Sequence, residues 1–287
     1  MKKQKDSMKN VHYFTILTKE FEDIANFGLY TFSKFNDIEL NVYVLDNSEL
    51  KLNYKNINYI FYNNKNIKLK NFNPEYISQK SINCAIQCLP ILDQDYDIYV
   101  RIDLDAIFEF PIKELVDYSE SNKIGFLGAR EYFRGGIERF KTDYYINCGI
   151  AVFNKEFLPK ISFTKEFFEM YNKDPSFYCC PEQDFFNTFE NRKSHPNLIT
   201  LSSENTDLVE SEGPKIIHLN GKYTKPFYKI PYFSELVYVY INKIKAISNK
   251  TGLFEDIIEK NYQFLKKEFK KLSKEQQYRL LRYKWKM

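Results

Sequence analysis

The stretch Asp97–Asp105 reads DIYVRIDLD, an apolar run that ends in two aspartates. Its β-branched and aromatic residues are typical of a buried strand. Alternate residues of an extended segment face the same side, so we expect Asp103 and Asp105 to converge on one point. Two carboxylates at that spacing suit Mg²⁺ or Mn²⁺, which are hard cations that prefer oxygen ligands. The alternatives are a solvated turn, or an aspartate paired with Arg101.

Strand-like and helix-like segments alternate on both sides of this stretch. Such alternation predicts an α/β fold with a mostly parallel central sheet covered by helices on both faces. In sheets of this kind ligands collect beyond the carboxyl ends of the strands, where the aspartates lie. The expected strands are 11–17, 41–45, 58–62, 97–102, 123–129, 144–153, 198–201 and 215–219, and the expected helices are 20–35, 74–89, 155–171 and 182–189.

Composition and charge divide the chain into two parts. The 287 residues are 44% apolar and 28% charged, which is typical of a globular protein. Residues 229–287 hold 14 of the 42 Lys and Arg but only 6 of the 38 Asp and Glu, so their net charge is +8 against −4 for residues 1–228. From residue 233 to 272 apolar residues recur at helical spacing. We therefore expect a globular body at 1–228 and a helical basic extension at 229–287.

The cysteines and the hydropathy pattern bear on the compartment. The chain has 5 cysteines, an odd number, with no C-x-x-C motif and a vicinal pair at Cys179-Cys180. These features favour a reducing compartment. No run of about 18 apolar residues is found, so we expect no membrane span. The sequence predicts a cytoplasmic protein.

Five ordered motifs extend the argument beyond the aspartate pair. Taken together they resemble glycosyltransferase family 8, over residues 11–228. The opening βαβ unit of that family resembles 11–17 with 42–46, its Y-x-D-x-D strand resembles 99–105, its Y-F-N-A-G-V segment resembles 145–154, its D-Q-D-x-x-N segment resembles 182–187, and its H-x-x-G-x-x-K-P-W segment resembles 217–221 with 225–227. The resemblance implies a single GT-A-like domain at 1–228 that binds a nucleotide-sugar and is catalytic.

The resemblance also implies metal and donor ligands. A neutral imidazole at His218 would complete a metal shell begun by Asp103 and Asp105, and imidazole suits Mn²⁺. Gly221 would let the backbone approach a phosphate, and the ammonium of Lys225 would neutralise the leaving phosphate. The alternatives are a core or surface histidine and an ordinary surface lysine. The donor-binding set is Ile16, Leu17, Thr18, Asp103, Leu104, Asp105, Asn147, Cys148, Gly149, Gly221 and Lys225.

Two further segments are assigned to the sugars by the resemblance. Asn147 and Gly149, on an otherwise apolar strand, are placed near the donor sugar; the alternative is a strand-edge bulge. The carbonyl of Gln183 would face the anomeric carbon and stabilise positive charge there, while Glu182 and Asp184 would bind sugar hydroxyls. The alternative for these three residues is a capping cluster, since acids favour the first turn of a helix.

The implied activity is retaining, metal-dependent transfer of galactose or glucose from a UDP-sugar to a saccharide or glycolipid acceptor, as in lipopolysaccharide biosynthesis. Thr18-Lys19 replaces the family's Asp pair that helps to read uracil, so the nucleotide preference stays open. One rival is a sugar nucleotidyltransferase, but Thr18-Lys19-Glu20 is not the Gly-rich basic loop such enzymes place after the first strand. The other rival is a catalytically silent interaction protein, which the complete metal and Gln183 motifs disfavour.

The basic C-terminal extension has two interpretations. Aromatic and cationic residues mixed along a helix suit an anionic membrane surface, and a glycolipid acceptor would make such docking useful. The alternative is a pair of helices packed on the body with solvated lysines. We weigh the two evenly for 233–272 and favour the membrane surface for 275–287. Nucleic acid is not expected as a partner, because the body is acidic and lacks a recognised binding module.

Overall fold

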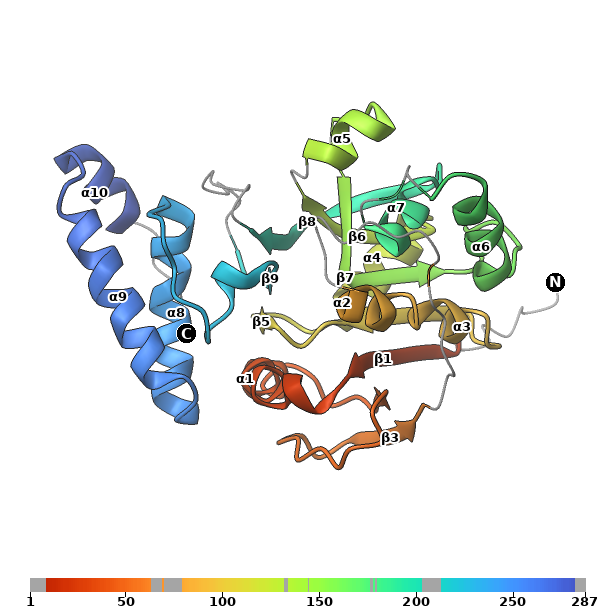
Figure 1. The fold of residues 1–287 in the computed structure, drawn as a ribbon, viewed down its shortest axis with the longest axis horizontal. Helices are drawn as coiled ribbons and strands as arrows, with labels where there is room; N and C mark the ends of the chain where they lie inside the picture. The colour runs from red at the N-terminus through yellow and green to blue at the C-terminus, as the bar shows by residue number, and fades with distance from the viewer. Residues whose placement is uncertain are drawn as a thin grey trace, which may run out of the picture.

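The computed structural model describes residues 9–62, 69, 79–131, 134–143, 145–175, 178, 180–202 and 213–281. Within these residues the centre of the molecule is one nine-stranded sheet (Figure 1). Its strands are β1 (Val11–Leu17), β2 (Leu40–Val44), β3 (Ile57–Phe61), β4 (Ile98–Ile102), β5 (Ala106–Phe108), β6 (Phe126–Glu131), β7 (Tyr145–Asn154), β8 (Arg192–Leu201) and β9 (Ile216–Leu219).

The sheet is mixed but mostly parallel, with the strand order β3-β2-β1-β4-β7-β6-β8-β9-β5. The β1–β2, β2–β3, β1–β4, β6–β8 and β8–β9 pairs are parallel. The β4–β7, β6–β7 and β5–β9 pairs are antiparallel. The predicted α/β class with a mostly parallel sheet is therefore confirmed.

Helices cover both faces of the sheet. They are α1 (Glu22–Phe32), α2 (Gln79–Ala85), α3 (Cys88–Leu92), α4 (Lys113–Ser121), α5 (Arg134–Phe140), α6 (Phe163–Lys173) and α7 (Pro181–Asn187), with short 3₁₀ turns η1 (Lys19–Phe21) and η3 (Lys222–Thr224). One buried cluster packs α1 and α4 against β1, β2 and β4. A second, rich in phenylalanine, packs α2, α3, α6 and α7 against the sheet. Two separate cores therefore hold the central strands between them.

The C-terminal residues form α8 (Glu235–Thr251), α9 (Glu255–Phe269) and α10 (Lys274–Leu281), drawn in blue in Figure 1. Leu236, Tyr240 and Ile244 of α8 are buried in one cluster with Phe27 of α1 and Leu219 of β9. The predicted helical character of this region is confirmed, and α8 and α9 pack on the body. No helix among the described residues is long and apolar enough to cross a membrane.

The structure corrects several expected boundaries. The helix expected at 155–171 begins only at Phe163. Its N-cap is Ser162, and Asp93, distant in sequence, accepts further hydrogen bonds from the N–H groups of Phe163 and Thr164. The helix expected at 20–35 is the 3₁₀ turn η1 followed by α1. The expected 74–89 helix is broken into α2 and α3, and its residues 74–78 lie outside the described part. Three elements were not anticipated, namely β5, α4 and α5.

The short strand β5 decides where the site forms. Asp103-Leu104-Asp105 is the link between β4 and β5. In the antiparallel β5–β9 pair, Ala106 lies opposite His218. On the other side, the N–H of Asp103 donates to the carbonyl of Gly149 on β7 at 2.7 Å. The sheet itself therefore brings the aspartate link, β7 and β9 to one point.

Candidate active site

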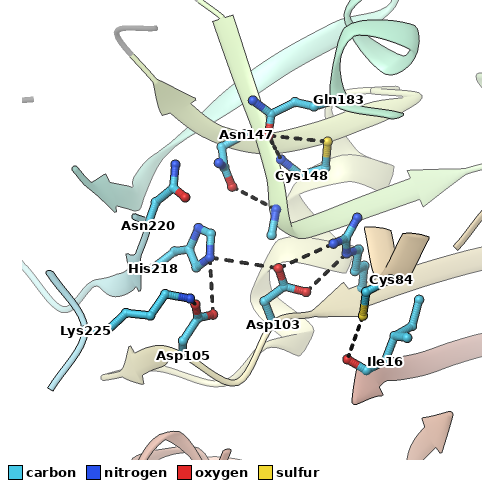
Figure 2. Close-up of polar contacts among 12 residues, drawn as sticks. Ile16, Cys84, Asp103, Asp105, Asn147, Cys148, Gln183, His218, Asn220 and Lys225 are labelled. Carbon is cyan, nitrogen blue, oxygen red and sulfur yellow. Dashed lines mark hydrogen bonds and ion pairs between the residues drawn. The ribbon is translucent and has the colours of Figure 1, made fainter. Parts of the chain in front are cut away.

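Asp103, Asp105 and His218 come together at the end of β4 (Figure 2). The Nε2 atom of His218 lies 3.3 Å from Oδ1 of Asp105 and 3.9 Å from Oδ2 of Asp103. One ligand atom from each residue lies within 4.8 Å of the other two. The side chain of His218 is 5% exposed, whereas that of Asp103 is 29% exposed. The cluster is thus held by the core on one side and open to solvent on the other.

The geometry and chemistry of these three groups fit a divalent cation. Ligands at neighbouring positions of an octahedral shell, with bonds of about 2.1 Å, lie about 3 Å apart. The separation of His218 Nε2 from Asp105, 3.3 Å, is close to that value, and the separation from the more exposed Asp103, 3.9 Å, is about 0.9 Å longer. Two carboxylate oxygens and one imidazole nitrogen form a donor set that Mn²⁺ accepts well. The geometry predicted from the sequence is therefore present, although the identity of a metal does not follow from it.

The ammonium of Lys225 is bonded to Oδ2 of Asp105, on the carboxylate whose other oxygen faces His218. Burial acts to raise the pKa of Asp105, but Lys225 and His218 outweigh it and hold that pKa well below its usual range. Burial acts to lower the pKa of His218, but Asp105 and Asp103 outweigh it, so the pKa is raised. Asp105 is therefore ionised, and its two oxygens interact with the ammonium of Lys225 and the imidazole of His218.

Gly149 makes room for the imidazole. A Cβ atom at Gly149 would lie 2.2 Å from Cε1 and 2.6 Å from Nε2 of His218. Such distances are far inside van der Waals contact. Gly28 has a comparable role on the other side of the link, because its Cβ would lie 1.8 Å from the backbone oxygen of Leu104. Both glycines therefore permit close approaches that the aspartate link and its histidine require.

Beside the cluster, a buried carboxylate joins three amides from three elements. Oε2 of Glu131, at the end of β6, accepts from Asn147 Nδ2 at 3.1 Å and from Gln183 Nε2 at 2.9 Å. Oε1 of Glu131 accepts from Nδ2 of Asn220, in the loop after β9. Burial raises the pKa of Glu131, and these amide donors oppose the rise. Glu131 thus fixes the orientation of side chains from β7, α7 and the β9 loop.

The amide of Gln183 is oriented by this arrangement. Because its NH₂ group faces Glu131, its Oε1 faces β7 and accepts from the N–H of Cys148 at 3.2 Å (Figure 2). Gln183 is 8% exposed and Cys148 is 1% exposed. Asn147 is held from its other end as well, since its Oδ1 accepts from the N–H of Gly149 at 2.8 Å. Amides on β7 and α7 therefore form one connected network next to the metal-ligand cluster.

The two acids beside Gln183 have different surroundings. Asp184 is fully buried and accepts hydrogen bonds from Tyr145 Oη at 2.6 Å and from the N–H of Cys180 at 3.0 Å. The second contact is a capping interaction at the start of α7, and it agrees with the capping cluster given above as the alternative role of this segment. Glu182 is 6% exposed and lies beside Arg101 of β4, with 3.9 Å between Oε1 and Nη1. Glu182 therefore lies within the site, while Asp184 lies in the packed interface between α7 and β7.

The remaining predicted donor residues lie at the ends of strands. Ile16, Leu17 and Thr18 are buried at the end of β1, where the carbonyl of Ile16 lies 4.0 Å from the Cys84 thiol (Figure 2). Gly221 has φ of +78°, a conformation that glycine adopts without strain, and it precedes η3. Their contacts with a donor stay predictions.

Sequence reasoning missed three groups at this site. Arg101 was considered only as a structural partner of Asp103, and its Nε does lie 3.2 Å from Oδ1 of that residue. Glu131 and Asn220 were not singled out. For Glu131 a signal was available in the sequence, because it is an ionisable residue at the end of an apolar strand. Such a residue is costly to bury unless partners bind it.

The lysines of α9 face solvent, whereas Lys243 of α8 is buried beside Glu109. Lys260 and Lys267 of α9 are exposed, and so is Lys271 after it. On α10, Tyr278 and Leu281 are each 65% exposed. Residues 282–287, which carry much of the predicted aromatic and basic cluster, lie outside the described part.

Comparisons with known proteins agree with this architecture. No family model matches the sequence, and no curated protein matches it. Among solved structures, the galactosyltransferase LgtC in complex with donor and acceptor sugar analogues is similar at 14% identity, over 86% of this chain and 96% of that one, with a TM-score of 0.61. The glycosyltransferase GlyE of Streptococcus pneumoniae is similar at 11% identity, over 85% and 63%, with a TM-score of 0.52. Mouse xyloside xylosyltransferase 1 is similar at 15% identity, over 72% and 97%, with a TM-score of 0.50.

At these identities the likeness establishes the fold, which is that of the GT-A glycosyltransferases. The fold does not by itself fix a reaction, because function depends on the site that a fold carries.

Proposed function

We propose that this chain is a metal-dependent glycosyltransferase of family 8, which moves galactose or glucose from a UDP-sugar to a saccharide or glycolipid acceptor with retention of configuration. The observation that carries the proposal is the convergence of Asp103, Asp105 and His218 on the GT-A fold. Asp103, Asp105 and His218 would hold Mn²⁺ or Mg²⁺. Such an ion acts as Lewis acid and template for the donor diphosphate.

The residues around the ion have separate tasks in this proposal. The ammonium of Lys225, already beside Asp105, would take up negative charge on the departing diphosphate. Asn147 and Gln183, oriented by Glu131, would bind the donor sugar. The buried surroundings of Gln183 would exclude water, which strengthens the electrostatic interactions of the site.

Retention of configuration depends on which face of the donor sugar the nucleophile attacks. Among the described carboxylates at the site, Glu131 is occupied by three amides, Asp184 by Tyr145, Arg139 and the α7 start, and Glu182 lies beside Arg101. Glu131 and Asp184 would lose these contacts if they acted as nucleophiles, and we assign Glu182 to a sugar hydroxyl. We therefore favour front-face attack by the acceptor hydroxyl on an ion-pair-like intermediate, with the carbonyl of Gln183 near the positive charge.

Two rival functions predict different behaviour. A sugar nucleotidyltransferase would need a phosphate-binding loop after β1, where this chain has the short turn η1. A catalytically silent protein would have no reason to keep three metal ligands in coordinating reach. A thermal-shift screen of UDP-, GDP- and CMP-sugars, each with and without Mn²⁺, separates these functions and supplies the missing donor identity.

The test of the proposal is the substitution Asp103→Asn. It removes one anionic ligand, so Mn²⁺-dependent transfer and donor hydrolysis should both be abolished. The matched control is Asp95→Asn, on an exposed aspartate in the turn before β4, which should retain full activity. A fully active Asp103→Asn variant would refute the assignment.

A membrane-bound acceptor would give the basic extension a task. The exposed Tyr278 and Leu281 of α10, next to Arg279, would insert among the headgroups of an anionic bilayer. Flotation of the full chain with phosphatidylglycerol vesicles, and its absence with phosphatidylcholine vesicles, is the expected result. Equal recovery with both lipids would contradict this part of the proposal.

A further inference from the structure

One edge of β7 extends beyond its partner β4. The two strands pair only from Ile150 to Asn154 of β7, while the earlier residues of β7 pair with β6 on the other edge. The N–H groups of Ile146 and Cys148 lie two residues apart, so they point to the same edge of the strand. Both residues are at most 1% exposed. Water therefore cannot satisfy these buried backbone groups, and other partners have to.

Two amide side chains of α7 are those partners. Oδ1 of Asn187 accepts from the N–H of Ile146 at 3.0 Å, and Nδ2 of Asn187 donates to the carbonyl of Ile146 at 2.8 Å. Oε1 of Gln183 accepts from the N–H of Cys148 at 3.2 Å. The helix α7 therefore takes the place of a neighbouring strand along this part of β7.

The spacing of the two contacts fits both elements. Gln183 and Asn187 are four residues apart, which advances a helix by about 6 Å. Ile146 and Cys148 are two residues apart, which advances a strand by about 6.8 Å. One face of α7 thus matches alternate residues of β7, and a shift of the helix along the strand would break both contacts together.

Asn187 is also bonded to Gln183 itself. Nδ2 of Asn187 donates to the main-chain carbonyl of Gln183 at 2.9 Å. The amide of Asn187, which is 1% exposed, therefore joins the backbone of Gln183 to the backbone of Ile146. The side chain of Gln183 is held separately, by Glu131 and by Cys148. Asn187 thus fixes the main chain from which the carbonyl of Gln183 extends.

We propose that Asn187 is a positioning residue, which sets the place of Gln183 along β7 and thereby the place of its carbonyl at the anomeric carbon. The inference rests on the proposed function, in which Gln183 faces the donor sugar. A misplacement of about 1 Å can cost about 100-fold in the rate of a reaction. Loss of the Asn187 amide should therefore lower kcat, and it should leave donor binding at the metal-ligand cluster intact.

The kinetic test is Asn187→Leu, which keeps the approximate size of the side chain and removes its hydrogen bonds. With UDP-hexose and Mn²⁺, kcat should fall about 10- to 100-fold, while KM for the donor should change by less than about threefold. In a Gln183→Ala background the same change should alter kcat by less than about threefold, because the carbonyl that it misplaces is gone.

The matched control is Asn154→Leu. Asn154 is another fully buried asparagine of β7, and it pairs with Ile98, at the end of β4 remote from the aspartate link. Its loss should destabilise the protein but change kcat by less than about threefold.

Amide hydrogen exchange tests the same inference without turnover. In the wild-type protein the N–H groups of Ile146 and Cys148 should exchange about as slowly as that of Val152, which lies between β4 and β6. In Asn187→Leu, exchange should become at least about tenfold faster at Cys148 as well as at Ile146, because Gln183 moves, with Val152 unchanged. Faster exchange at Ile146 alone would overturn the inference, because Asn187 would then hold only its own contact.

The outcomes separate this inference from the function on which it rests. If the wild-type protein uses no UDP-sugar but exchange at Cys148 responds to Asn187, the proposed function fails and the placement of Gln183 by Asn187 stands. An equal loss of kcat in the wild-type and Gln183→Ala backgrounds would overturn the inference and leave the function. If Asn187→Leu does not fold, Asn187→Ser takes its place. Rapid exchange at Cys148 in the wild-type protein would overturn the inference without any variant.

Discussion

Replacing Gly149 by alanine should damage the metal-ligand cluster through His218. The new Cβ atom would lie 2.2, 2.6 and 2.7 Å from Cε1, Nε2 and Nδ1 of the imidazole. Carbon contacts are normally about 3.5 Å or longer, so the ring must retreat by about 1 Å. The backbone of His218 cannot follow easily, since β9 pairs with β5 on one side and β8 on the other. The ring therefore turns away from Asp105.

The expected magnitude follows from losing one ligand of three. Perturbing the support of a metal ligand typically lowers metal affinity 10- to 100-fold. Overpacking should also cost about 1–3 kcal/mol in the free energy of unfolding. The assay is a Mn²⁺ titration followed by electron paramagnetic resonance of the free ion, with UDP present, beside urea unfolding of the same samples.

A double-mutant cycle decides whether the effect acts through the imidazole. In a His218→Ala background the clash is gone, so adding Gly149→Ala should change Mn²⁺ affinity by less than about 0.5 kcal/mol. An equal loss of affinity in both backgrounds would refute the reasoning, because it would place the effect elsewhere. Unchanged affinity in the single variant would refute it too.

Three further predictions concern Glu131, Lys225 and His12. Glu131→Gln places an NH₂ donor among amide donors, so it should cost about 1–3 kcal/mol in urea unfolding and at least about tenfold in kcat; no change in either would contradict the amide network. Lys225→Met should lower kcat about 10²- to 10³-fold while Mn²⁺ affinity does not fall, since Lys225 shares Asp105 with the ion; weaker Mn²⁺ binding would contradict this. Burial lowers the pKa of His12 to about 4, below its unfolded value. The contribution of neutral His12 to the free energy of unfolding should therefore be complete above pH 6.5 and fall by on the order of 2 kcal/mol towards pH 4. His12→Phe should flatten that urea-unfolding profile, and an unchanged slope would contradict it.

The sheet could be predicted largely from local pattern. Each long strand carries its own run of β-branched or aromatic residues, and alternation with helices implies parallel pairing. The start of α6 has one local signal, the N-cap Ser162, but its second cap, Asp93, lies far away in the chain and no local pattern shows it. The strand β5 has only three residues, Ala106–Phe108, which is too short for a periodic signal.

The candidate site was predictable in its ligands but not in its surroundings. Asp103 and Asp105 follow from strand alternation, whereas His218 reaches them only through the β5–β9 register, which no local pattern encodes. Glu131 and Arg101 are single ionisable residues on apolar strands. Their importance lies in partners from other elements, such as Gln183 for the first and Glu182 for the second, and such partners appear only in three dimensions.

Three residues that lie far apart in the sequence are proposed to bind one divalent ion. Crystals grown with UDP and MnCl₂, and measured at the manganese absorption edge, test it most directly. We predict one anomalous peak within coordinating distance of Asp103, Asp105 and His218, adjacent to the diphosphate. A peak bound elsewhere, or well-ordered UDP without any peak at these side chains, would contradict it.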